Sequence, residues 1–350
     1  MRTQVQIYIY AIALFVGLHC KDETLPPCTD CPQQVDTTSH DFTFYVDTLG
    51  DGNSSVLKDI VILNEKTIFA VGSINFKNRN GEYDPDSFYN VVKWVGTDRI
   101  FYKSNSFELN SIICFSEDDL WVFTSAPYHW NGSAWQGFDI TGKFNGSVSK
   151  VWGASNKNYY MIGTNGSVAH YNGSNWIPIS TGTTLDFKDI WGDKNPTTGE
   201  YEIYAVASKG PFSTERKIFR IQGTTATEIS TDGIPYSASC IWFTSQKQYY
   251  VAGGGMWKKD NITSNTPWQS FENGVTPYYI YGMRGQSVND IVAVGSFGEL
   301  LHYNGTSWKS FRDLPGFNNL ELYSVDIKGN VLCAVGYIGN RACVVRGYRR

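Results

Sequence analysis

Hydrophobic and polar residues alternate in short runs along most of the chain, and turns that contain Gly separate the runs. The clearest copy of this pattern spans residues 147–179. Its predicted strands are residues 147–152, 159–163, 167–171 and 176–179. Short alternating runs rich in aromatic and β-branched residues fit half-buried strands. We predict type I′ turns at Asn165-Gly166 and Asn172-Gly173, because Asn and Gly best tolerate two successive positive φ angles.

A heptad of the form His-aromatic-Asn-Gly-x-x-Trp begins at His129, His170 and His302. The stretch that starts at Met161 also matches the stretch from Ala293 without gaps. His302 follows His170 at about three times the interval between His129 and His170, so two disguised copies lie between them. A repeat of this length that holds several short strands is typical of a β-propeller.

Strand-like runs that open each copy indicate the number of blades. They begin near Val56, Leu109, Ser147, Leu185, Ser237, Tyr278 and Leu322. We predict an all-β, seven-bladed β-propeller, with six blades as the alternative because the first and fourth copies are stretched. The last copy lacks its fourth strand, whereas an unpartnered run, DFTFYV at residues 41–46, precedes the first copy. We predict that this N-terminal strand completes the last blade, which also removes an exposed sheet edge.

The N-terminus has the features of a lipoprotein signal. The apolar run Ile7–Leu18 is too short to span a bilayer and ends just before Cys20. We therefore predict a signal peptide over residues 1–19, lipidation at Cys20, a lipidated tether over residues 20–40 and a propeller domain over residues 41–350. Acyl chains on Cys20 would hold the protein on a membrane without a transmembrane helix in the mature chain.

The residues after Cys20 bear on location. Lys21, Asp22 and Glu23 resemble the export signal, a Lys followed by two acidic residues, with which some Gram-negative bacteria place lipoproteins on the cell surface. We expect a lipid-anchored, surface-exposed protein of the bacterial outer membrane. A secretory signal cut elsewhere and an uncleaved anchor are the alternatives.

Charge and cysteine content restrict the partners and the chemistry. The formal net charge of −4 and the pI near 5.8 argue against a nucleic-acid partner. The Cys28 and Cys31 pair has no second Cys-x-x-Cys with which to form a zinc site. Cys114 and Cys240 lie in strand-like runs and are expected to be core residues. The pairing of cysteines 333 and 343 is left open.

The repeated polar residues are expected to be structural. His129, His170 and His302 occupy one position of different blades, which is too far apart for a shared metal, so we predict no metal site and no cofactor. Asn-Gly-Ser/Thr triplets are interpreted as turns rather than glycosylation sites. The recurring acids are expected to cap turns and strand ends; they are Asp59, Asp119, Asp189 and Asp290.

The motifs IWG, AVG and HYNG followed by Trp resemble those of bacterial secreted propeller-repeat lipoproteins. They are more distantly similar to photosystem II assembly-factor propellers and to the Asp-box repeats of sialidases. The resemblance implies an architecture, because propellers carry many unrelated functions. The arginine triad, Tyr and Glu of a sialidase cannot be identified in the chain, and we predict no catalytic residue.

Insertions that interrupt the repeat are the best candidates for function, because binding residues concentrate on loops of a rigid scaffold. Ser73–Phe88 and Ser208–Lys217 are inserted between the second and third strands of the first and fourth copies. Gly253–Trp268 begins at the same connection in the fifth copy and continues beyond it. The predicted contact residues are Tyr83, Phe88, Phe212, Arg216, Met256 and Trp257.

These observations predict a membrane-anchored lipoprotein whose propeller binds a protein or glycan partner through a loop-rich face. The alternative is a carbohydrate-active enzyme, such as a glycosidase, lyase or transferase, with its site in the axial funnel. A glycosidase would need two carboxylates facing each other about 5 to 10 Å apart. A purely structural envelope protein is a third possibility.

Overall fold

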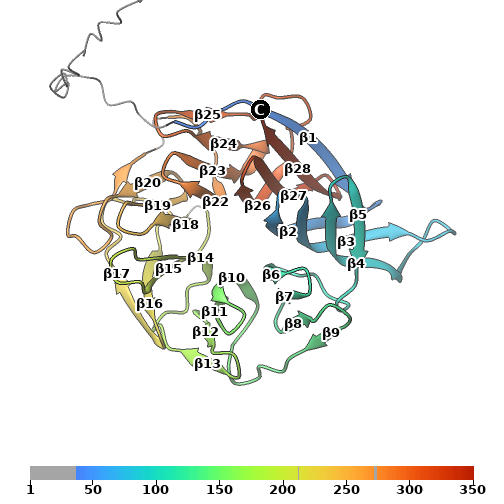
Figure 1. The fold of residues 1–350 in the computed structure, drawn as a ribbon, viewed down its shortest axis with the longest axis horizontal. Coiled ribbons are helices and arrows are strands. Elements are labelled where there is room, and N and C mark those ends of the chain that lie inside the picture. The colour runs from blue at the N-terminus through green and yellow to red at the C-terminus, as the bar shows by residue number, and fades with distance from the viewer. Residues whose placement is uncertain (1–36, 212, 272–273) are drawn as a thin grey trace, which may run out of the picture. The chain divides into compact units, whose positions relative to one another are not determined.

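Seven four-stranded antiparallel sheets surround a central axis (Figure 1), as the sequence predicted. The structure is a computed structural model that describes residues 37–350 except 212 and 272–273. In each sheet, or blade, the first strand lies beside the axis and the fourth lies at the rim. The predicted strand starts all fall in or just before the innermost strands.

The first four blades follow chain order. Blade 1 contains β2 (Gly52–Asn64), β3 (Thr67–Lys77), β4 (Tyr83–Val95) and β5 (Asp98–Tyr102). Blade 2 contains β6 (Ser111–Ser116), β7 (Asp119–Phe123), β8 (Pro127–Trp130) and β9 (Trp135–Gly137). Blade 3 contains β10 (Val148–Ser155), β11 (Asn158–Gly163), β12 (Val168–Tyr171) and β13 (Trp176–Ile179). Blade 4 contains β14 (Phe187–Lys194), β15 (Tyr201–Ser208), β16 (Arg216–Gln222) and β17 (Thr225–Ile229).

The remaining blades include the one that closes the ring. Blade 5 contains β18 (Ala238–Thr244), β19 (Gln248–Gly253), β20 (Met256–Lys259) and β21 (Gln269–Ser270). Blade 6 contains β22 (Ile280–Ser287), β23 (Asp290–Gly295), the 3-10 turn η1 (Ser296–Gly298), β24 (Leu300–Tyr303) and β25 (Trp308–Ser310). Blade 7 contains β26 (Glu321–Lys328), β27 (Val331–Ile338), β28 (Arg341–Arg349) and, as its outermost strand, β1 (Phe42–Leu49).

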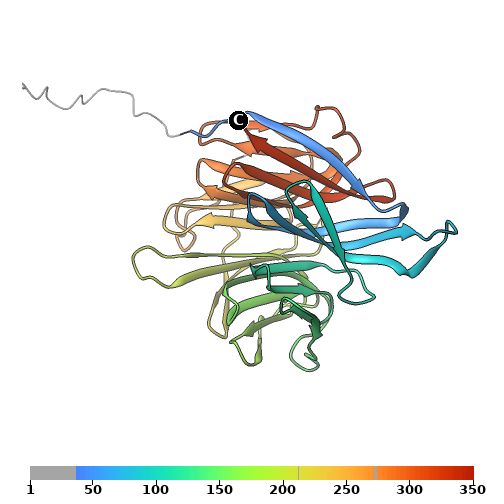
Figure 2. The same ribbon diagram turned by 45° about the vertical axis from the view of Figure 1, so that its right-hand side comes forward.

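The N-terminal strand closes the ring, as the sequence predicted. β1 pairs antiparallel with β28 from Phe42 opposite Arg349 to Leu49 opposite Ala342. Figure 2 shows β1 lying along β28. Phe42, Phe44 and Val46 also pack against the core between blades 6 and 7. The first and last strands of the ring are therefore held together by a backbone ladder and by apolar burial.

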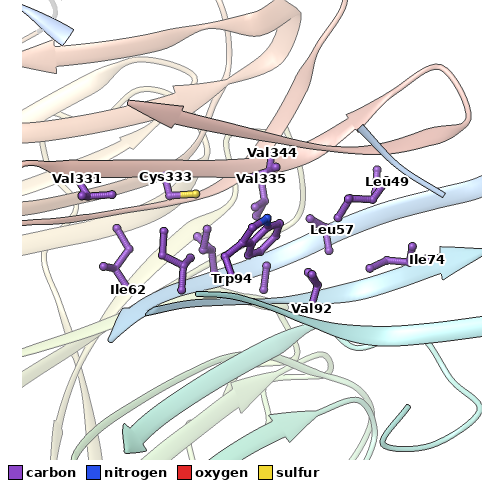
Figure 3. Close-up of a cluster of buried hydrophobic side chains, with 14 residues drawn as sticks. Leu49, Leu57, Ile62, Ile74, Val92, Trp94, Val331, Cys333, Val335 and Val344 are labelled. Carbon is purple, nitrogen blue, oxygen red and sulfur yellow. The ribbon is translucent and has the colours of Figure 1, made fainter. Parts of the chain in front are cut away.

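Hydrophobic clusters between neighbouring blades form the core. Figure 3 shows the cluster between blades 7 and 1, in which Leu57 and Trp94 of blade 1 meet Val335 and Val344 of blade 7. Trp94 is fully buried, and its indole N–H has no hydrogen-bond partner. Burial of one large apolar side chain stabilises a fold by about 1.5–3 kcal/mol, which offsets the cost of about 1–3 kcal/mol for an unpaired buried N–H group.

The Trp-Gly motif of the innermost strands serves this packing. A Cβ at Gly192 would lie 2.5 Å from the ring of Trp152 in the preceding blade. In the same way, a Cβ at Gly285 would lie 2.8 Å from the ring of Trp242. The glycine of one blade therefore leaves room for the tryptophan of the blade before it.

The two Asn-Gly turns of blade 3 differ. Asn165 and Gly166 have φ angles of 57° and 69°, and the amide of Ser167 donates to the carbonyl of Thr164, as a type I′ turn requires. At the second turn the prediction of type I′ was wrong. Gly173 has positive φ but Asn172 does not, and four residues separate β12 from β13.

The side chain of Asn172 organises that second turn. Its Oδ1 accepts hydrogen bonds from the amides of Ser174 (3.1 Å) and Asn175 (2.8 Å). Asn131 and Asn304 make the same pair of bonds in blades 2 and 6. Side-chain capping of a local turn explains the Asn-Gly-Ser/Thr triplets of these blades in structural terms.

The described cysteines form no disulfide. Cys240, Cys333 and Cys343 are buried, and burial raises the pKa of the thiols of Cys240 and Cys343 to about 12. Cys114 is only partly buried, which differs from the expected core position, because it lines the axial channel.

The predicted signal peptide, the lipidation site Cys20 and most of the predicted tether lie outside the described residues. Among residues 37–350, apart from the three that are not described, there is no helix with the length and apolar character needed to cross a membrane.

Candidate functional site

The ring has two chemically different faces. Turns between the first and second strands of a blade, and between the third and fourth, emerge on one face, which we call the hairpin face. Turns between the second and third strands, and the links from blade to blade, emerge on the opposite face, which we call the loop face.

The chain enters the ring on the hairpin face. The amide of Thr38 donates to the carbonyl of Asn304, and its hydroxyl donates to the carbonyl of Asn289. Both asparagines lie in turns of the hairpin face. Residues 37–41, which lead into β1, therefore lie on the side of the ring opposite to the loop face.

Two of the predicted insertions lie on the loop face and one does not. Residues 73–88 extend β3 and β4 into a long hairpin, and residues 209–215 connect β15 to β16. In blade 5, only residues 254–255 separate β19 from β20. The extra residues there, 260–268, connect β20 to β21 on the hairpin face, which corrects the placement of this insertion.

The predicted contact residues have different environments. Tyr83 is 40% exposed, and its hydroxyl donates to the carbonyl of Asp51 on the loop face. Phe88 and Arg216 are partly exposed. Phe212 lies outside the described residues.

Met256 and Trp257 are buried in the core of blade 5, with exposures of 1% and 5%, which corrects their interpretation as surface contacts. Their strand, β20, follows β19 after a tight turn, so both side chains pack between blades.

A row of four tyrosines crosses the loop face from blade 6 to blade 7. The ring centroids of Tyr279 and Tyr281 are 5.2 Å apart, and those of Tyr281 and Tyr323 are 5.3 Å apart. Tyr337 continues the row at 5.7 Å from Tyr323. The tyrosine row was not predicted, although the alternating tyrosines of YYIYG, residues 278–282, are a visible signal for it.

A groove of about 420 Å³ adjoins the end of the tyrosine row, between blades 7 and 1. Its lining residues are Ser54, Ser55, Val56, Lys58, Glu108, Tyr323, Tyr337, Gly339 and Asn340. The Lys58 ammonium lies 4.9 Å from the centre of the Tyr323 ring and 3.5 Å from Glu108. Asn53 and Ser54 both have positive φ, a strained conformation that tends to occur at functional sites.

Blade 6 presents a further aromatic residue on the loop face. Phe297, in η1, is 58% exposed and has a φ of 58°. Its ring lies 5.0 Å from that of Tyr278, over which the Arg312 guanidinium lies at 4.9 Å. The loop face therefore carries exposed aromatic surface beside positive charge.

Two ion pairs divide the axial channel. The Lys150 ammonium of blade 3 contacts Asp59 of blade 1, and it donates to the Ser324 hydroxyl of blade 7 at 3.2 Å. The Arg284 guanidinium of blade 6 binds both oxygens of Asp189 in blade 4, each at 2.8 Å. Lys150 lowers the pKa of Asp59 despite its burial.

Asp59 and Asp189 also join neighbouring blades, because each accepts a backbone N–H from the next innermost strand. The donors are Ile112 for Asp59 and Ile241 for Asp189, both at 3.1 Å. The prediction that these acids cap turns and strand ends was wrong. They lie within the innermost strands, and their ion pairs join blade 1 to blade 3 and blade 4 to blade 6.

The three repeated histidines each bond a side chain of their own blade, which is a structural role. His129 contacts Asp119 at 2.8 Å, and His170 contacts Asn158 at 2.8 Å. His302 contacts Asp290 at 2.9 Å. Among the described residues no cluster of His, Cys, Asp and Glu could hold a metal ion.

A cavity of about 400 Å³ lies in the half of the channel toward the hairpin face. The apolar residues that line it include Val61, Ile113, Val151, Trp152, Trp191 and Val325. Its polar lining is Asp59, Lys150, Arg284, Asp326 and Lys328. An apolar wall with a few placed polar groups is the usual make-up of a small-molecule site.

Comparisons with known proteins establish the architecture alone. No protein-family model and no curated protein sequence matches the chain. YCF48 bound to a D1 peptide is 15% identical, with a TM-score of 0.64 over 88% of this chain and 97% of that chain. The WD40 propeller of Doa1 is 13% identical, with a TM-score of 0.59 over 87% and 95%. Virginiamycin B lyase from Staphylococcus aureus is 8% identical, with a TM-score of 0.62 over 89% and 100%.

Proposed function

We propose that this chain is a lipid-anchored binding protein of the cell surface that docks a segment of a partner protein on its loop face. The tyrosine row, Tyr279 to Tyr337, and the adjoining groove are the observation that carries the proposal. Half-buried tyrosines provide a large contact area and lose little side-chain entropy on binding, which is why aromatic residues dominate protein interfaces.

The position of the chain entry supports the loop face as the docking surface. Thr38 is bound on the hairpin face, so a lipid on Cys20 would attach the ring from that side. The tyrosine row would then be turned toward a partner and not toward the membrane. The YCF48 structure, whose description names a bound D1 peptide, offers a precedent for peptide binding by a propeller of this shape.

The chemistry of the groove favours a polypeptide as its occupant. Tyrosine hydroxyls, Ser54 and Asn340 can bond backbone amides of an extended peptide. Lys58 and Glu108 lie beside each other at the groove, so residues of either charge sign could be matched.

The enzymatic alternative lacks suitable carboxylates at Asp59 and Asp189. A glycosidase needs one carboxyl group with a raised pKa as the general acid and a second, free carboxylate. Asp59 has a lowered pKa and binds Lys150, and Asp189 is bound through both oxygens by Arg284. Neither residue meets either requirement.

The docking site can be tested by capture of partners from surface-protein extracts with purified full-length chain. Tyr281→Ser combined with Tyr323→Ser should reduce capture of a specific partner at least about tenfold, because central interface aromatics each contribute about 2 kcal/mol. Tyr45→Ser and Tyr201→Ser are matched controls, since these tyrosines are 55% and 43% exposed but lie outside the row. Equal capture by both pairs of variants would refute the site.

Binding of the wild type, but not of the variant with Tyr281→Ser and Tyr323→Ser, to a glycan array with no protein partner would instead identify a glycan ligand.

The anchor is tested separately. Cys20→Ser should move the protein from the membrane fraction to the soluble fraction, and retention of the variant on membranes would contradict lipidation at Cys20.

A further inference from the structure

Asp326 differs from the two other acids of the channel, because those two each form an ion pair. Lys150 is matched by Asp59, and Arg284 is matched by Asp189. Asp326 is the remaining acid, and among the described residues no Lys, Arg or His nitrogen lies within 4.0 Å of it. Lys328 stands at the exposed mouth of the cavity and donates to the carbonyl of Leu63.

Asp326 is held firmly in place by the backbone. One of its oxygens accepts the amide of Ile62 in blade 1 at 2.8 Å, and the other accepts the amide of Ile327 at 2.9 Å. Each carboxylate oxygen can accept a further bond. Burial raises the pKa of Asp326, although its two backbone bonds and the charges of Arg284 and Lys150 act in the opposite direction.

Two tryptophans occupy the same strand position as Asp326 in other blades of the ring. Strand register places Asp326 opposite Cys333, and the equivalent positions of blades 3 and 4 hold Trp152 and Trp191, opposite Tyr160 and Tyr204. Both indole side chains are partly exposed, and both line the cavity. Trp191 already carries the Arg284 guanidinium at 5.0 Å from its ring centre.

We propose that this cavity binds a small organic cation, with its charged nitrogen beside the Asp326 carboxylate and its apolar part against Trp152 and the aliphatic wall. The bound cation would give Asp326 the ion-pair partner that Asp59 and Asp189 already have. Methyl groups on nitrogen would suit the wall, because alkylammonium groups are attracted to indole faces and need no hydrogen-bond acceptors. This site is separate from the loop face and does not rest on the proposed docking function.

The proposal requires a definite pH dependence. The titratable groups around the cavity are Asp59, Cys114, Lys150, Arg284, Asp326 and Lys328. Lys150 lowers the pKa of Asp59, burial raises the pKa of Cys114 to about 12, and Arg284 stays charged. A quaternary ammonium does not titrate. Its affinity must therefore rise as Asp326 loses its proton and become constant at higher pH.

Choline and the larger benzyltrimethylammonium are suitable probes for titration calorimetry and tryptophan fluorescence with the full-length protein. The uncharged isostere of choline, dimethylbutanol, has carbon in place of nitrogen. We expect the cations to bind at least about tenfold more tightly than the isostere, since loss of the charge removes both the ion pair and the cation–π attraction.

Asp326→Asn should weaken binding of the cation at least about tenfold and abolish its pH dependence. Asp193→Asn is the matched control, because Asp193 accepts the amides of Ser245 and Lys194 in the same manner but does not line the cavity. Circular dichroism would verify that both variants fold.

The wild-type pH profile provides a second test that needs no variant. Equal binding of cation and isostere, equal binding by Asp326→Asn and Asp193→Asn, or wild-type affinity that does not change with pH would each overturn the proposal. So would failure of both cations to bind at millimolar concentration.

Discussion

Acidification should release the segment that leads into β1. His40 and His302 face each other with their Nδ1 atoms 2.8 Å apart, a geometry that accommodates one proton between them. His302 bonds through Nε2 to Asp290, which is also bound by the Arg349 guanidinium. The Nε2 of His40 lies 3.3 Å from the Ser307 hydroxyl. With both imidazoles neutral, every nitrogen of the pair has a partner.

An additional proton on this neutral pair has no favourable position, because each ring nitrogen already has a partner. Burial lowers the pKa of His40 from 6.5 to about 4, and the neighbouring His302, Lys309 and Arg349 add to the effect. Because the docked segment binds a proton less readily than the free segment, docking is at full strength above pH 6.5. It weakens as the pH falls toward 4.

The expected size of this effect follows from the linkage relation. Each pH unit between 6.5 and 4 weakens docking by up to about tenfold. Solvent screens this partly exposed side chain, so we expect the undocked population to rise about ten- to a hundredfold between about pH 7 and about pH 4.5. The ring itself should stay closed, since β1 keeps its ladder with β28 and Arg349 keeps Asp290 paired.

Hydrogen exchange measured by mass spectrometry, corrected for the intrinsic pH dependence of amide exchange, reports on this release. Protection of the Thr38 amide should fall in the wild type but stay nearly constant in His40→Gln, which cannot acquire the charge. The turn at residues 164–167 in blade 3 serves as an internal reference. Unchanged Thr38 protection over this range, or the same pH dependence in His40→Gln, would refute the reasoning.

Two further predictions concern stability and can be checked by urea unfolding. Gly192→Ala should destabilise the fold by about 1–3 kcal/mol because its Cβ would meet the Trp152 ring, and wild-type stability would contradict this packing role. Lys150→Met should cost about 3–5 kcal/mol by leaving Asp59 buried without its cation. Adding Asp59→Leu to Lys150→Met should recover part of that loss, and a double variant less stable than the single one would contradict the ion-pair explanation.

The sequence was sufficient to predict the ring because its signals are local. Alternating strands and Asn-Gly turns identified the blades one at a time. The closing strand, although it pairs with residues about 300 positions away, was predictable because one blade lacked a strand and one strand lacked a blade. Asn172 shows the limit of this approach, because a side-chain bond and not its own φ angle determines the turn.

The candidate sites were less predictable because they depend on distances across the ring. No local sequence pattern indicates that Lys150 forms an ion pair with Asp59 two blades away, or that Tyr281 lies beside Tyr323. Met256 and Trp257 were misassigned for a related reason. The length of the blade 5 insertion did not reveal which connection held the extra residues, and β20 occupies the part that was expected to be a loop.

The pairing of β1 with β28 also determines when the molecule can finish folding. All the other strands of the ring are synthesised between these two, so β1 must wait for its partner until blades 1 to 6 have been made. Contacts between such distant segments form slowly, because a long loop has to close first. Blade 7 is therefore the last blade that can assemble, and until then β1 and its phenylalanines remain exposed to chaperones and proteases.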